Sequence, residues 1–349
     1  MKKAVYQLMA LLVVLALLAG CAPATAPVAE PAVPAEPAAP AEEPFRVALI
    51  TPSTVNDFAF SQSIMEGLKV VQAQMGGPSM FEIALSESMF VVPDAAAAIR
   101  DYASQGFDLV IAHSSRYGTS LQQIAPEFPE VAFAWGNSLD TFQKAGVENV
   151  FAYQAEAQEG GYAMGVLAAH MTETGMIGVS GPVEAGDAKL YVDGFVAGVK
   201  NAGVPAEVAV SYTGSFSDVS LMAAAAETHT ANGADVMTGS SQSVVGAIGV
   251  LRDKGGYWFG QQWDQTGLAP ELVVASQVYD WSHILGDIVK SVRAGVMGGK
   301  SYTLTFNNEG LRIVFNPGIE VPAEGMAAFE AAIQGIKDGT IDPLTGPKQ

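Results

Sequence analysis

The chain has 349 residues, of which 49% are hydrophobic and only 15% are charged, so it is long enough for two domains and can bury a large core. Its formal net charge of −19, without a basic stripe, repels phosphate backbones and argues against nucleic acid as a partner. The only cysteine, Cys21, excludes a disulfide framework and a thiolate metal site.

The first 44 residues have the composition of a secretion signal followed by a spacer. Two lysines precede the short apolar segment 11–18, which is typical of a signal peptide. The sequence LAGC that ends at Cys21 resembles the lipobox of bacterial lipoproteins, which implies cleavage before Cys21 and a lipid anchor on its sulfur. Residues 22–44 are almost all Ala, Pro and Glu, which favours a disordered tether. We therefore predict a signal peptide and lipobox over residues 1–21, with a membrane as partner.

Residues 45–71 predict the first strand, loop and helix. The apolar segment 45–50 is typical of a buried strand, and the polar residues after it lead into a helix with apolar residues at helical spacing. Asn56, Asp57 and Phe60 lie where the strand gives way to the helix, which is the edge where open α/β sheets bind ligands. Two interpretations stay open: a ligand site, or Asp57 as a helix cap and Phe60 as core.

Strands and helices alternate along the rest of the chain. We predict further strands at 81–85, 107–112, 131–135 and 149–154, and then, after a helix at about 156–171, at 176–180, 207–212, 234–237 and 257–260. A helix to about residue 297, strands at 302–306 and 311–315 and a helix at about 324–337 complete the pattern. Repetition of strand, polar loop and helix predicts parallel sheets covered on both faces.

The predicted fold is α/β, with two doubly wound Rossmann-like lobes joined by a hinge, as in type I periplasmic binding proteins. The N-terminal lobe is expected to comprise residues 45–153 and about 280–308. The C-terminal lobe is expected to comprise residues 154–279 and about 309–349. Two facing lobes would bring the loops at both carboxyl edges to one cleft.

The predicted strand-end loops share polar and aromatic side chains suited to a neutral, planar ligand with hydroxyls. The candidate ligand-binding residues there are Asn56, Asp57, Phe60, Ser114, Trp135, Asn137, Phe216, Ser240, Gln262, Trp263 and Asp264, and Ser115, Ser138 and Gln242 share these loops. The alternative is that Ser, Asn and Asp cap helices, which we favour for most of the serines. For Asp57, Asp264 and the aromatic residues we favour a ligand.

Signals for catalysis, metals and cofactors are poor. The four histidines are far apart and form no HExxH motif, and there is no GxSxG motif. The segment 294–301 is similar to a phosphate-binding loop, but Ala294 replaces the first glycine and a helix precedes it. We therefore predict no catalytic residues, no metal and no cofactor.

Several motifs in order resemble the basic membrane protein family of lipoproteins, which are substrate-binding components of ABC transporters that include purine nucleoside receptors. The likeness runs from about residue 45 to 315 and is carried by segments 56–62, 160–165, 194–199, 214–218 and 260–265. The resemblance implies that Asp57 and Asp264 accept hydrogen bonds from a nucleoside and that Phe60 and Phe216 sandwich its base.

Three positions depart from that family's pattern, and they bear on the identity of the ligand. Ser61 stands where Asn is usual, Gln262 replaces an Asp, and Tyr279, a further candidate ligand-binding residue, stands about where nucleoside binders often carry Lys. The expected function is a lipid-anchored, extracytoplasmic binding protein, not an enzyme, that delivers a purine nucleoside or related heterocycle to an ABC permease. The alternatives are a receptor for a membrane sensor and a secreted nucleoside hydrolase with Asp57 or Asp264 as base.

Overall fold

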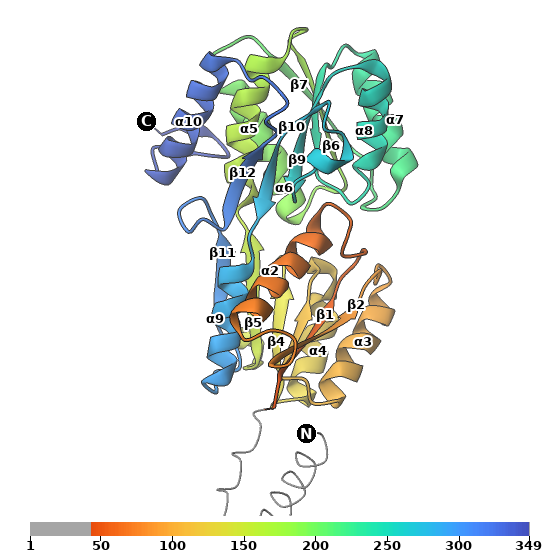
Figure 1. The fold of residues 1–349 in the computed structure, drawn as a ribbon, viewed down its shortest axis with the longest axis vertical. Coiled ribbons are helices and arrows are strands. Elements are labelled where there is room, and N and C mark those ends of the chain that lie inside the picture. Colours follow the sequence, from red (N-terminus) through yellow and green to blue (C-terminus); the bar gives the residue numbers. More distant parts are fainter. Residues whose placement is uncertain (1–42, 349) are drawn as a thin grey trace, which may run out of the picture. The chain divides into compact units, whose positions relative to one another are not determined.

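The computed structural model describes residues 43–348, so the predicted signal peptide, Cys21 and nearly all of the predicted tether lie outside the described residues. The described part contains two six-stranded sheets, each the centre of one α/β lobe (Figure 1). Helices cover both faces of each sheet, because the inner strands are buried on both sides and their alternate residues belong to different apolar clusters. The predicted fold class is therefore confirmed.

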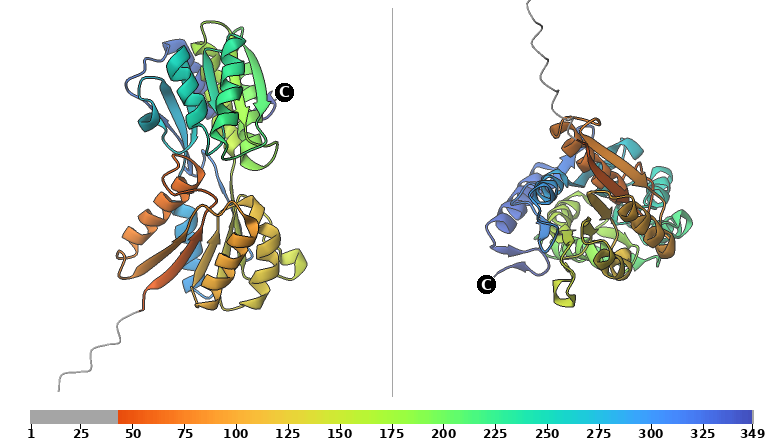
Figure 2. Two further views of the ribbon diagram at one scale, coloured as in Figure 1. Left: turned by 90° about the vertical axis from the view of Figure 1, so that its right-hand side faces the viewer. Right: turned by 90° about the horizontal axis from the view of Figure 1, so that it is seen from below.

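The first sheet is wholly parallel and has the strand order β11-β5-β4-β3-β1-β2. Its strands are β1 (Phe45–Ile50), β2 (Phe81–Ser86), β3 (Leu109–Ala112), β4 (Ala132–Gly136), β5 (Val150–Ala155) and β11 (Ser301–Leu304). Helices α2 (Phe60–Gln74) and α9 (Ser282–Arg293) pack on one face, and α3 (Val92–Ser104) and α4 (Gly118–Ile124) on the other (Figure 2). Alternation along β1 explains this, because Val47 and Leu49 face the first pair and Ala48 and Ile50 the second.

The second sheet has the order β12-β10-β9-β8-β6-β7. Its strands are β6 (Met176–Gly181), β7 (Glu207–Tyr212), β8 (Val236–Gly239), β9 (Tyr257–Gln262), β10 (Val273–Tyr279) and β12 (Leu311–Phe315). Helices α5 (Ala157–Met171), α6 (Gly186–Lys200) and α10 (Ala323–Lys337) cover one face, and α7 (Val219–Ala231) and α8 (Val245–Lys254) the other. One prediction was wrong: β12 is antiparallel to β10, so this sheet is not wholly parallel.

The remaining elements are short. They are the 3-10 helices η1 (Ser115–Tyr117), η2 (Ala125–Glu127), η3 (Gln143–Ala145) and η4 (Thr266–Leu268), and the hairpin of β13 (Ile341–Asp342) and β14 (Gly346–Pro347). Two of them, η1 and η4, directly follow strand-end loops that the sequence singles out.

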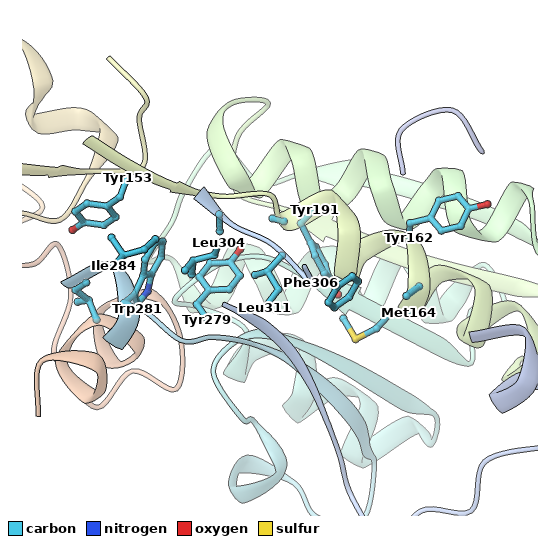
Figure 3. Close-up of a cluster of buried hydrophobic side chains, with 14 of the residues drawn as sticks. Tyr153, Tyr162, Met164, Tyr191, Tyr279, Trp281, Ile284, Leu304, Phe306 and Leu311 are labelled. Atoms are coloured by element: carbon cyan, nitrogen blue, oxygen red, sulfur yellow. The ribbon is translucent and has the colours of Figure 1, made fainter. Parts of the chain in front are cut away.

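Three chain segments pass between the sheets: the residue after β5, the residues between β10 and α9, and residues 305–310 between β11 and β12. Buried aromatic and aliphatic side chains surround these crossings. Figure 3 shows Trp281 beside Tyr153 and Ile284, with Tyr279, Leu304 and Leu311 continuing the cluster. The Trp281 ring packs edge-on against Tyr153 and Tyr279 at centroid distances of 5.1 and 5.6 Å.

Glu159, in the first turn of α5, links the second lobe to the crossing segment 305–310. Its carboxylate accepts a hydrogen bond from the backbone N–H of Phe306 at 2.6 Å. Burial raises the pKa of Glu159 to about 7 from its ordinary 4.5, although the Phe306 N–H lowers it. The folded state therefore holds this proton more tightly than the unfolded state, and the stability that it contributes is lost as the pH rises through about 7.

Glu159→Gln should therefore stabilise the protein at about pH 8, by about 1–2 kcal/mol after allowance for partial exposure, and change little below about pH 4.5. The glutamine keeps an acceptor for Phe306 but has no proton to lose. Urea unfolding at both pH values measures the difference. Glu330→Gln, on the exposed face of α10, is the matched control. An equal effect of Glu159→Gln at both pH values would contradict the assignment.

Candidate ligand site

A cavity of about 290 Å³ lies between the carboxyl ends of strands from both sheets. The first lobe lines it with Pro52, Phe60, Phe90, Ser114, Ser115, Arg116 and Asn137. The second lobe lines it with Val183, Ala185, Gly186, Asp187, Phe216, Gln242 and Gln262. Ligands of open α/β sheets bind at this edge, and the volume is close to the lower end for small-molecule sites.

Five of the twelve candidate residues line this cavity: Phe60, Ser114, Asn137, Phe216 and Gln262. The other seven do not line it, and they are Asn56, Asp57, Trp135, Ser240, Trp263, Asp264 and Tyr279. Loops of both lobes therefore line one cavity, as expected, but only some of their polar and aromatic side chains face it.

Asp57 has the geometry of the helix-capping interpretation. Its carboxylate accepts hydrogen bonds from the backbone N–H groups of Ala59, Ser61 and Gln62 at 2.8, 3.2 and 3.1 Å. The Ser53 hydroxyl donates to the same carboxylate at 2.5 Å. These bonds satisfy N–H groups at the start of α2 that have no partner within the helix. Asp57 therefore fixes the loop that carries Phe60.

Three other candidates are bonded to neighbouring residues and do not line the cavity. Trp135 stacks on Phe142 at a centroid distance of 4.8 Å and donates its indole N–H to the carbonyl of Ser114 at 3.0 Å. Asp264 accepts from the backbone N–H of Thr266 at 2.9 Å, at the start of η4. The hydroxyl of Tyr279, which is buried, donates to Asp187 at 3.2 Å. Neither Asp57 nor Asp264, the two candidate bases for a hydrolase, faces the cavity.

The Phe60 ring is held by a buried histidine. His113 stacks on it with a centroid distance of 3.8 Å and an interplanar angle of 14°. Burial lowers the pKa of His113 to about 3, so the ring is neutral. Because a carbonyl can only accept, Nε2 donates to the Phe60 carbonyl at 3.1 Å, and Nδ1 accepts from the Tyr153 hydroxyl at 2.8 Å. One face of Phe60 is thus occupied, and the ring is fixed for a ligand on the other.

Asp187, at the start of α6, joins the two lobes at the cavity. Its Oδ1 accepts from Asn137 Nδ2 of the first lobe at 2.5 Å. Its Oδ2 accepts from Gln262 Nε2 and the Tyr279 hydroxyl, both at 3.2 Å. Burial raises the pKa of Asp187, and the hydrogen bonds from Asn137, Gln262 and Tyr279 act in the opposite direction. A second link between the lobes runs from Gln265 Nε2 to the carbonyl of Phe58 at 3.1 Å.

Two residues that donate to Asp187 have unusual backbone conformations. Asn137 follows β4 and has φ +70°, and Gln262 ends β9 and has φ +74°. Residues other than glycine rarely have a positive φ. Those that do are common at ligand sites, where the surrounding structure holds the strained backbone. Equivalent strand ends in the two lobes thus aim one amide each at the same carboxylate.

Sequence reasoning missed Asp187, Arg116 and Phe90. Asp187 follows a glycine-containing loop after β6, and the place of that loop at a strand end matches that of the other candidate loops. Arg116 directly follows Ser114 and Ser115 in the loop after β3, so its position was the available signal. Phe90 lies between β2 and α3, in a segment with no pattern that indicates a ligand site.

Within residues 43–348, no group of three or more His, Cys, Asp or Glu side chains is arranged to hold a metal ion. None of the helices in that range has the length and apolar character needed to cross a membrane.

Comparisons with known proteins agree with this architecture. A family model described as Bmp, ABC transporter substrate-binding protein PnrA-like, matches residues 45–328. The chain is 28% identical over 308 residues to a purine-binding protein of Brucella abortus, covering 88% of this chain and 85% of the relative. It is 24% identical over 263 residues to the transcriptional activator protein med of Bacillus subtilis, covering 75% and 79%. A solute-binding protein of an ABC transporter from Aeropyrum pernix has the same fold, with a TM-score of 0.74 and 18% identity over 86% of this chain and 93% of that one.

Proposed function

The chain belongs to the Bmp family of PnrA-like ABC transporter substrate-binding proteins, and we propose that it captures a purine nucleoside or nucleobase for an importer. The observation that carries the proposal is the cavity between the lobes, because each lobe contributes aromatic and amide side chains to it. The family is one of substrate-binding proteins rather than enzymes, so a small-molecule ligand and a membrane permease are its partners.

A flat heterocycle fits the chemistry of the lining. Phe60, fixed from behind by His113, and Phe216 would stack on the ligand, each contributing ~0.5–1.5 kcal/mol beyond burial. Ser114, Asn137 and Gln262 would supply hydrogen bonds of ~1 kcal/mol each. Together with buried apolar surface, these contacts reach the ~−8 kcal/mol of micromolar affinity. The relative from Brucella abortus is named as purine-binding, which supports a purine.

Ligand capture would be coupled to closure of the lobes. The three crossings are short segments at the ends of β5, β10 and β11, where hinge rotation is absorbed by few residues. A ligand that contacts Phe60 in one lobe and Phe216 in the other binds the closed state better and shifts the population toward it. The closed form would then deliver the solute to the permease.

We further propose that Cys21 carries a lipid that holds the domain on the outer side of a membrane, with residues 22–44 as the tether. The composition of residues 1–44 supports this. Expression of the full chain and of Cys21→Ala in a bacterial host, with labelled palmitate and membrane fractionation, tests it. Label and protein should be in the membrane fraction for the wild type only. Equal labelling of both would overturn the anchor.

Thermal unfolding of residues 43–349 with a panel of nucleosides, nucleobases, flavins and sugars tests the ligand class. A ligand at about 100 times its Kd stabilises the folded state by ~2.7 kcal/mol and raises the melting temperature. Purine nucleosides or purine bases should give the largest rise. A rise with sugars or flavins and none with purines would refute the proposed ligand.

Phe216→Ala should weaken binding of the best purine ligand by at least about tenfold, because it removes one stacking face and its buried area. Phe216 is only partly buried, so the melting temperature without ligand should change little. Isothermal titration calorimetry measures the affinity. Phe315→Ala, a partly buried phenylalanine on β12 outside the cavity, is the control and should leave the affinity unchanged. Unchanged affinity in Phe216→Ala would remove it from the site.

A further inference from the structure

The side-chain amide of Asn137 has a fixed orientation. Its Nδ2 donates to Oδ1 of Asp187 at 2.5 Å. A flipped amide would place the Asn137 carbonyl oxygen against the carboxylate, and two acceptors repel each other. The direction of this amide therefore follows from the identity of Asp187.

The carboxylate that sets this orientation is itself surrounded by donors. Gln261 Nε2 donates to the Tyr279 hydroxyl at 2.7 Å, so the Tyr279 hydroxyl proton is free to point at Asp187. Gln262 Nε2 donates from the end of β9. All three side chains bonded to Asp187 thus face it with a hydrogen, which favours the ionised carboxylate as acceptor.

Two buried acceptors at the cavity have no partner among the described residues. They are Oδ1 of Asn137 in the first lobe and Oε1 of Gln242 in the second, and both residues line the cavity. Buried polar atoms in folded proteins are nearly always hydrogen-bonded, so an orphan pair at a ligand site calls for donors from outside the chain. Each lobe supplies one of these carbonyl groups.

We infer that the cavity selects purines that carry an exocyclic amino group, with the Asn137 and Gln242 carbonyls as its acceptors and Asp187 as the positioning residue that keeps Asn137 in the accepting orientation. The inference rests on the proposed function and narrows its ligand class. An amino group offers two hydrogens and can serve both carbonyls, whereas an oxo group would face them with a third acceptor. Asparagine and glutamine amides recognise the amino edge of adenine by the same chemistry.

Two pairs of nucleosides isolate the amino group. Adenosine and purine riboside differ only in the amino group at C6, and guanosine and inosine differ only in that at C2. In at least one pair the amino compound should bind about tenfold to a hundredfold more tightly to the wild type, because its partner leaves buried acceptors unsatisfied. Calorimetric titration of all four gives the ratios, and the pair that discriminates identifies the edge that faces the carbonyls.

Asp187→Asn tests the positioning role. Its new amide can donate to Asn137 Oδ1, so Asn137 can turn, and the discrimination ratio should fall to within about threefold whatever happens to overall affinity. Gln242→Met removes the second carbonyl at similar size and should also lower the ratio. Asp193→Asn is the matched control, because Asp193 lies on the same helix in an exposed ion pair with Lys189 and should keep the wild-type ratio.

The outcomes distinguish failure of the amino selectivity from failure of the proposed function. If purine nucleosides bind but the affinities within both pairs differ by less than about threefold, the purine function stands and the amino selectivity is refuted. Ordered water that satisfies the two carbonyls would give this result. If Asp187→Asn folds and keeps the wild-type ratio, Asp187 does not position Asn137. If no purine binds the wild type, the proposed function and this inference both fail.

Discussion

Trp281→Ala should lower the free energy of unfolding by about 3–5 kcal/mol, as is typical for truncation of a large, fully buried aromatic side chain. Trp281 is 0% exposed and lies directly between β10 and α9, at one of the three crossings. Its ring contacts Tyr153 and Tyr279 (Figure 3), and its indole N–H donates to the Ser63 hydroxyl on α2 at 3.0 Å. Truncation leaves a cavity between the two lobes and removes the donor to Ser63, whose hydroxyl keeps only its bond to the carbonyl of Phe60.

Urea unfolding at constant pH measures this effect, and Trp263→Ala is the matched control. Trp263 is only partly buried, after the end of β9, so its removal should cost less than about 1.5 kcal/mol. Trp281→Phe retains part of the ring volume and should fall between the two. Equal destabilisation by Trp281→Ala and Trp263→Ala would contradict the view that the crossings are anchored by this cluster.

Strands with an apolar segment between turn residues could be predicted from the local sequence pattern. The segments 45–50, 207–212 and 311–315 form β1, β7 and β12 with the predicted ends. Short segments rich in apolar residues and bounded by polar turn residues favour strands, so their ends are marked in the sequence. The direction of β12 could not be predicted in this way, because a strand's partner and polarity depend on where the chain returns and not on its own residues.

Strand β10 escaped prediction because polar residues interrupt it. Its residues Val273–Tyr279 are all buried, yet the segment contains Ser276 and Gln277. The Ser276 hydroxyl accepts from the backbone N–H of Gln265 at 3.0 Å, and Gln277 Nε2 donates to the carbonyl of Ala157 at 3.2 Å. The partners lie outside the strand, so the strand's own sequence shows only two polar residues. In the folded chain both side chains are buried and hydrogen-bonded.

The candidate site shows the same limit. Sequence placed polar side chains on the loops that meet at the cavity, because carboxyl ends of parallel strands share an edge. It could not decide which side chains face inward, since Asp57 and Asp264 are held by nearby backbone N–H groups. The Asp187 carboxylate is held at the cavity by hydrogen bonds from Asn137 and Gln262, which are 50 and 75 residues away in the sequence. Long-range hydrogen bonds of this kind leave no local pattern.

Gly198→Ala should destabilise the protein by about 3 kcal/mol, at the upper end of the cost of overpacking. Helices α5 and α6 approach so closely that a Cβ on Gly198 would overlap the carbonyl oxygen of Tyr162, and one on Gly165 would overlap that of Phe195. A Cβ on Gly161 would come within 2.5 Å of the carbonyl oxygen of Tyr191. Backbone atoms on both helices form these contacts, so no side-chain rotation can relieve them, and the helices would have to separate.

Gly249→Ala on α8 is the control for Gly198→Ala, and it should stabilise the protein instead of destabilising it. Gly249 has no atom within 4 Å of an added Cβ, so alanine there should gain its helix propensity and stabilise the protein by about 0.5–1 kcal/mol. The same propensity gain acts at Gly198 and must be outweighed by the clash with Tyr162. Parallel urea unfolding of both variants measures the two signs. Stabilisation by Gly198→Ala would show that the two helices can part at little cost, and that their close contact is not what holds the second lobe together.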